Sequence, residues 1–116
     1  DDRLIGHENR WGYAVTSDPG AGLFKRITRY DRQGGPSLHR QVGDGQMVGE
    51  PVFAARSADA EEDDGFVLHQ FYDAATDRSA IDVLDARAID GEPLARLWLD
   101  ERIPMGFHGS FAPGVV

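Results

Sequence analysis

Cysteine, long hydrophobic runs and an excess of positive charge are all missing from this sequence. Because cysteine is absent, disulfide bonds and thiolate metal sites are excluded, which leaves histidine, carboxylate and backbone carbonyl groups as the possible metal ligands. No stretch approaches the roughly 20 apolar residues that a membrane-spanning helix needs, so we expect no transmembrane segment. The 12 Lys and Arg residues are outnumbered by 20 Asp and Glu residues, and the net charge of −8 argues against a nucleic-acid partner. The lack of cysteine fits a reducing compartment, and we expect a cytoplasmic location.

Long helices are also not expected, because 14 Gly and 6 Pro residues interrupt the chain at fairly even intervals. Between these breaks lie runs rich in β-branched, aromatic and aliphatic residues, which is the pattern of short strands. The 116 residues are enough for one small domain with a modest core. Seven strands are predicted, at residues 11–16, 23–30, 38–42, 51–55, 65–72, 80–86 and 94–99.

Alternation of side chains supports the strand assignment in the second half of the chain. Ile81 and Val83 should lie on one face of their strand and their sequence neighbours on the other, and Leu97 and Leu99 are expected to form a drier face. The run 66–72 alternates poorly, which predicts an inner strand covered on both faces. The regular recurrence predicts an all-β fold built as an antiparallel meander, which is compatible with a sandwich, a barrel or propeller blades.

The four histidines are the first candidates for metal ligands, since neutral imidazole suits iron, copper or zinc. They are 30 to 39 residues apart, so none forms the close pair that places two ligands on one element. A self-contained metal site is therefore not predicted. His7, His39 and His69 are expected to be surface or hydrogen-bonded structural histidines.

His108 has a different setting, in the segment Ile103-Pro104-Met105-Gly106-Phe107-His108-Gly109-Ser110-Phe111. Gly106 and Gly109 lack a Cβ atom, so the backbone on either side of the imidazole can turn sharply or approach another group closely. The neighbouring aromatic side chains are expected to keep water away. These features suit either a structural turn histidine or a metal ligand.

Two groups of carboxylates are further candidates for a site. Glu50 lies in Gly49-Glu50-Pro51-Val52-Phe53, where the following proline favours extended backbone at the entry to an apolar strand. It could face solvent at a strand edge, or it could accept a hydrogen bond from the free N–H of a ligand histidine. The cluster Glu61-Glu62-Asp63-Asp64-Gly65 lacks the spaced oxygen ligands of a calcium loop, and we expect a solvated acidic turn.

Six short motifs follow one another along the chain in a recognisable order. They are Arg10-Trp11-Gly12-Tyr13-Ala14, Arg29-Tyr30-Asp31, Gly49-Glu50-Pro51-Val52-Phe53, Glu62-Asp63-Asp64-Gly65, Ile81-Asp82-Val83-Leu84-Asp85-Ala86-Arg87 and Pro104-Met105-Gly106-Phe107-His108-Gly109. The series resembles the C-terminal end of the carotenoid cleavage oxygenases, a family that includes stilbene-cleaving dioxygenases and the animal retinoid isomerase. The similarity extends over nearly the whole chain, and we expect residues 1–116 to be a C-terminal fragment of a single β-propeller domain.

The resemblance implies a seven-bladed β-propeller with ferrous iron on its axis, held by four histidines from different blades, with glutamates behind three of them. His108 matches the last of these histidines, and Glu50 matches a glutamate that hydrogen-bonds a ligand histidine. We expect Glu50 to accept a hydrogen bond from the ring nitrogen of His108 that does not face the metal. The other three iron ligands are expected before residue 1. No nucleophile motif or further catalytic side chain is predicted.

The implied reaction is the O2-dependent cleavage of a conjugated double bond in a carotenoid, apocarotenoid or stilbene, giving two carbonyl products. The implied partners are O2 and an apolar conjugated substrate. Because one histidine and one glutamate cannot retain ferrous iron, the fragment alone is expected to be inactive. Isomerisation without cleavage at the same iron is chemically allowed. The alternative is a non-catalytic binding or interaction module of the β-propeller type that holds no metal.

Overall fold

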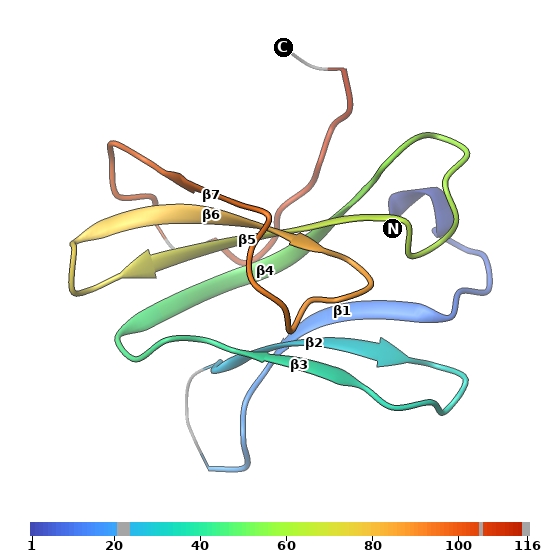
Figure 1. Ribbon diagram of the computed structural model, residues 1–116, viewed down its shortest axis with the longest axis horizontal. Helices are drawn as coiled ribbons and strands as arrows, with labels where there is room; N and C mark the ends of the chain where they lie inside the picture. The colour runs from blue at the N-terminus through green and yellow to red at the C-terminus, as the bar shows by residue number, and fades with distance from the viewer. Residues whose placement is uncertain (21–23, 105, 115–116) are drawn as a thin grey trace.

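The computed structural model describes residues 1–20, 24–104 and 106–114, so the first residue of the predicted strand 23–30 and Met105 of the His108 segment lie outside the described part. Within these ranges the chain forms one short 3₁₀ helix and seven strands (Figure 1). None of the helical segments in these ranges is long and apolar enough to cross a membrane. The elements are η1 (Asp2–Leu4), β1 (Trp11–Thr16), β2 (Arg26–Asp31), β3 (Leu38–Gln41), β4 (Gln46–Ala55), β5 (Gly65–Asp73), β6 (Arg78–Asp85) and β7 (Ala95–Trp98).

The strands form two antiparallel sheets. Sheet A has the order β1-β2-β3 and sheet B has the order β4-β5-β6-β7, so each strand pairs with its neighbour in the sequence. Figure 1 shows sheet A lying below sheet B, with β1 next to β4. The predicted all-β antiparallel meander is therefore confirmed, as two successive meanders joined by residues 42–45.

The hydrophobic core fills the space between the two sheets. In β6, the residues at even positions from Ala80 to Leu84 are buried while Ile81 and Val83 are only half-buried, which confirms the predicted alternation. β5 alternates in the same sense, with one face turned toward sheet A. One core cluster comprises Ile27, Val67, Leu84, Ala86 and Ile89 with Tyr13, Leu38 and Phe53 against it, and a second comprises Val48, Phe71 and Ala80 with Val15 and Val42 against it.

Two predictions about individual strands are wrong. The run 66–72 is fully buried on one face only, because its other face, which includes Phe66 and Leu68, is half-buried. The strand β7 has no drier face, since all four of its residues are exposed and Leu97 keeps 51% of its surface accessible. β7 is the last strand of sheet B and has a neighbour on one side only, so less of it is covered.

A β-bulge interrupts the pairing of β4 with β5. Val48 pairs with Phe71 and Pro51 pairs with His69, so Gly49 and Glu50 together stand opposite a single residue of β5. The extra residue keeps both Val48 and Pro51 on the buried face. The prediction of a strand over 51–55 found only the part of β4 that follows this bulge.

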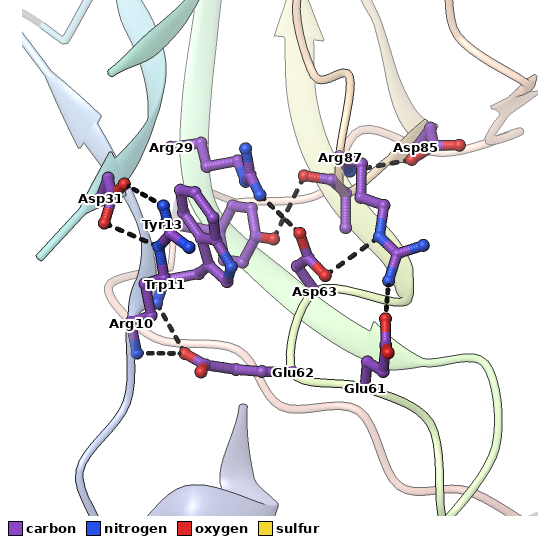
Figure 2. A network of polar contacts seen from close by, with 11 residues as sticks. Arg10, Trp11, Tyr13, Arg29, Asp31, Glu61, Glu62, Asp63, Asp85 and Arg87 are labelled. Atoms are coloured by element: carbon purple, nitrogen blue, oxygen red, sulfur yellow. Dashed lines mark hydrogen bonds and ion pairs between the residues drawn. The ribbon is translucent and has the colours of Figure 1, made fainter. Parts of the chain in front are cut away.

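The sequence predicted a solvated turn at the acidic segment Glu61–Asp64, and this prediction is wrong. The segment is the main polar junction between the two sheets (Figure 2). The Glu62 Oε1 atom accepts hydrogen bonds from the backbone N–H groups of Arg10 and Trp11, both at 2.6 Å. The Arg10 guanidinium turns the other way and binds both carboxylate oxygens of Asp31 at 3.0 and 2.7 Å. That pair lowers the pKa of Asp31 and raises the pKa of Arg10.

Asp63 connects two arginines from different parts of the chain. It accepts from Arg29 of β2 at 2.6 Å and from Arg87 at 3.0 Å, and Arg87 also donates to Glu61 at 2.6 Å (Figure 2). The Arg29 guanidinium also lies over the Trp11 ring, 3.4 Å from its centre, as a cation–π contact. The cluster was misread because the partners of Glu61, Glu62 and Asp63 are distant in the sequence, so these carboxylates appeared unpaired.

We expect Asp63→Asn to lower the free energy of unfolding by about 2–4 kcal/mol, because the change removes the charge that two guanidinium groups share and leaves the buried Arg29 without a counter-ion. Urea denaturation measures this. Asp100→Asn is the control and should cause no measurable change. The Asp100 side chain is fully exposed, and its contact with Arg78 is long, at 4.0 Å. Equal stability of the two variants would contradict a structural role for the acidic segment.

Candidate metal-binding site

The structure brings His108 and Glu50 together although they are 58 residues apart in the sequence. After β7 the chain turns back over the face of sheet B that points away from sheet A, and the N–H of Ile103 donates to the Ser79 hydroxyl at 2.9 Å. His108 then comes to lie over the bulge of β4. Its Nδ1 atom is 3.3 Å from Oε2 of Glu50.

The same glutamate oxygen also holds the backbone beside the histidine. The N–H of Gly109 donates to Glu50 Oε2 at 3.1 Å. A Cβ atom at Gly109 would lie 3.1 Å from Cγ2 of Val52, closer than ordinary van der Waals contact. The expected close approach at Gly109 is therefore confirmed, and its partner is β4. The sequence did not reveal that the N–H of Gly109 would share the carboxylate with the imidazole.

The geometry leaves one imidazole nitrogen of His108 available. An ionised carboxylate only accepts hydrogen bonds, so the contact with Glu50 requires the proton to be on Nδ1 of His108. The lone pair is then on Nε2, and the side chain of His108 is 87% exposed, so Nε2 can reach a metal ion. A carboxylate behind the other ring nitrogen fixes the tautomer and strengthens the donor. The donor therefore fits ferrous iron, which neutral imidazole suits.

A cavity of about 200 Å³ adjoins His108 on the same face of sheet B. Its wall is largely apolar and includes Val52, Leu68, Ile81 and Ile103. The expectation that aromatic neighbours would shield His108 is wrong for the described residues, because Phe107 keeps 91% of its surface accessible. Phe107 therefore makes little contact with the strands.

The other histidines do not join His108. His7 is exposed, and Nδ1 of His39 is 3.0 Å from the Thr28 hydroxyl, which agrees with the prediction for these two residues. For His69 the prediction is wrong, because its side chain is buried and neither ring nitrogen has a hydrogen-bond partner in the described part of the chain. Within residues 1–20, 24–104 and 106–114, no group of three or more His, Asp or Glu side chains could hold a metal ion.

Comparison with known proteins places the chain in one family. The sequence model of the family described as retinal pigment epithelial membrane protein matches residues 1–113. A probable carotenoid cleavage dioxygenase 4 of Arabidopsis thaliana is 37% identical over 115 residues, which cover 93% of this chain and 19% of the relative. An apocarotenoid-15,15'-oxygenase of Synechocystis is 33% identical over 110 residues, which cover 93% of this chain and 22% of the relative.

Solved structures agree with this assignment. The lignostilbene dioxygenase of Pseudomonas brassicacearum is 34% identical with a TM-score of 0.88, and the match covers 98% of this chain and 26% of that one. A cobalt-substituted apocarotenoid oxygenase of Synechocystis is 31% identical with a TM-score of 0.83, over 92% of this chain and 23% of that one. The chain thus spans about a fifth of the length of the curated relatives. It belongs to the carotenoid cleavage oxygenase family, the family of the retinal pigment epithelial membrane protein.

Proposed function

We propose that this chain is the C-terminal part of an iron(II)-dependent dioxygenase that cleaves a conjugated C=C bond with O2. The observation that carries the proposal is the contact of His108 with Glu50, which leaves one imidazole nitrogen free beside an apolar cavity. In the proposed reaction the C=C bond breaks and each carbon receives one oxygen atom of O2, giving two carbonyl groups. No other oxidant or reductant is needed for this balance.

In this proposal His108 is an iron ligand through Nε2, and Glu50 is the residue that orients it. The Nδ1–H donates to Glu50, and the negative carboxylate stabilises the positive charge that the ring acquires when Nε2 donates to a metal. The N–H of Gly109 holds the carboxylate from a second direction, so Glu50 cannot rotate away without losing both bonds. Bound iron would supply the capacity to bind and activate O2 beside an electron-rich alkene.

The remaining iron ligands are proposed to lie in other parts of a longer protein. The described residues supply one suitable imidazole and no metal-binding cluster, so the 116-residue chain alone is proposed to retain no iron and to be inactive. Sheets A and B are proposed to be consecutive blades of a seven-bladed propeller. Their meander topology supports this, as does the contact of β1 with β4, since the first strands of adjacent blades lie nearest the axis.

The proposed substrate is an apolar conjugated compound, namely a carotenoid, an apocarotenoid or a stilbene. The relatives' names support this range, because they include carotenoid, apocarotenoid and lignostilbene oxygenases. The cavity beside His108, at about 200 Å³, is smaller than the roughly 300–1,000 Å³ of typical ligand sites. We therefore propose that most of the substrate groove comes from outside this chain.

The direct test of the proposal is His108→Ala in the complete protein. We expect loss of iron and of double-bond cleavage with the β structure retained, because one ligand of the metal is removed. Metal analysis, product analysis under O2 and circular dichroism measure these three properties. His7→Ala is the control, since His7 is exposed and does not line the cavity beside His108. A His108→Ala protein with normal iron content and turnover would show that His108 is not a ligand.

Glu50→Gln tests the role of the carboxylate. Gln can still accept the hydrogen bond from Nδ1 but supplies no negative charge, so we expect iron affinity or initial rate to fall by about 10- to 100-fold, less than in His108→Ala. Glu101→Gln is the matched control, because Glu101 is exposed and makes no polar contact in the described structure. Glu62 is unsuitable as a control, since it holds the backbone of β1. Near-normal iron affinity and initial rate in Glu50→Gln would show that the charge of Glu50 does not support a metal ligand.

Gly109→Ala tests whether the backbone beside His108 must lie close to β4. The added methyl group would press on Val52, so we expect the tail to shift and iron affinity to fall by about 10-fold. In the double variant Val52→Ala/Gly109→Ala the space is restored, and iron affinity should recover. Equal affinity of the single and double variants would mean that the Val52 contact does not position His108.

A further inference from the structure

A row of four side chains crosses sheet B on the face turned toward sheet A. The strand register places Pro51 of β4 beside His69 of β5, His69 beside Asp82 of β6, and Asp82 beside Arg96 of β7. On β5, Val67 of one core cluster precedes His69 by two residues, and Phe71 of the other cluster follows it by two. The row therefore separates the two apolar clusters of the core.

Asp82 is the acceptor in this row. The Arg96 guanidinium donates to both of its oxygens, at 2.6 and 2.9 Å, and the Asp82 side chain is almost fully buried. Arg40 reaches over from β3 of sheet A, 3.8 Å from Asp82 Oδ2, and also donates to the Gly91 carbonyl at 2.6 Å. Asp82 thus joins sheet A to sheet B by an ion pair, and its charge is shared between two arginines.

His69 lies next to this ion pair without taking part in it. It is 3% exposed, its ring stacks on Phe71 with centres 5.6 Å apart, and neither ring nitrogen has a hydrogen-bond partner among the described residues. The charged groups that face it are Asp82 from β6, Arg96 from β7 and Arg40 from β3, while β4 presents the uncharged Pro51. A proton on His69 would add a third positive charge around one carboxylate, in a place that water does not reach.

We propose that His69 makes the seam between sheet A and sheet B sensitive to acid, because protonation of its buried ring is accommodated only when Arg40 and sheet A separate from sheet B. The neutral ring is compatible with the closed seam. The protonated ring repels Arg40 and Arg96 and needs water, which it obtains only in the open state. This response to pH involves neither His108 nor Glu50, so it does not depend on the proposed oxygenase activity.

The direction of the pH effect follows from the burial of the ring. Burial lowers the pKa of His69 to about 4, with the two arginines acting in the same direction and Asp82 opposing them. An exposed histidine has a pKa near 6.5. Between about pH 6.5 and 4 the His69 ring therefore binds a proton in the open state but not in the closed state. The closed state is thus favoured fully above about pH 6.5. Its advantage declines as the pH falls toward 4, by a total on the order of 10²-fold in the opening equilibrium.

The test is amide hydrogen exchange in the complete protein at pH 7 and pH 5, corrected for the intrinsic effect of pH on exchange. The amides to follow are those of Arg10 and Trp11, which donate from sheet A to Glu62 and lose this acceptor when the sheets separate. For these amides we expect protection to fall by about 30-fold in the wild type and by less than about 3-fold in His69→Leu. His7→Gln, which changes an exposed histidine, should behave as the wild type does. Equal losses of protection in the wild type and His69→Leu, or no loss in the wild type, would overturn the proposal.

A second measurement covers the case in which His69→Leu does not fold. Nuclear magnetic resonance titration of the His69 ring in the wild-type protein should show a midpoint near pH 4, or loss of the folded signal before the ring titrates. A fully reversible titration of the folded protein with a midpoint near pH 6.5 would show that the ring accepts a proton in the closed seam. That result would overturn the proposal without any variant.

Discussion

The polar contacts of Glu62 and Asp63 fix how sheet A lies against sheet B, and the rest of the structure depends on this placement (Figure 2). Apolar contacts between two sheets are non-directional, and the two core clusters alone would tolerate several arrangements. Charged hydrogen bonds are directional. Glu62 accepts from the backbone at the start of β1, and Asp63 accepts from Arg29 of β2, so these contacts select one arrangement. Because β1 lies next to β4, the same contacts determine where the strand that carries Glu50 is placed.

The candidate site itself is made of irregular backbone on a regular support. Glu50 belongs to the bulge of β4. The bulge allows its carboxylate to point outward while the side chains of Val48 and Pro51 stay on the buried face. His108 belongs to a tail whose described residues, 99–104 and 106–114, have no strand pairing; the tail is held by the Ser79 hydroxyl at Ile103 and by Glu50 at Gly109. Sheet B supplies rigidity, and the two exceptions to its regularity supply the polar groups.

Much of the fold could be predicted from local pattern, since strands of alternating residues separated by Gly and Pro identify themselves. The pairing of Glu50 with His108 followed from motif resemblance, and no local pattern links residues 58 positions apart. The role of Glu61, Glu62 and Asp63 was missed because a cluster of carboxylates looks solvated until its distant partners, Arg29, Arg87 and the backbone of β1, are known. His69 was misjudged for a similar reason: in the sequence it is one more polar residue in an apolar run, and only the strand register shows that its side chain points inward.

The separation between Glu50 and His108 also has a consequence for the order of folding. Both sheets are built from strands that are neighbours in the sequence, so their hairpins close short loops and can form early. The contact of His108 with Glu50 closes a loop of 58 residues, so we expect it to form after the bulge of β4 and the Ser79 anchor. A metal ion that needs this histidine cannot act as a nucleus for folding, as zinc does in small zinc-dependent domains. In the proposed oxygenase, iron capture is therefore expected to be among the last steps, after the sheets have formed.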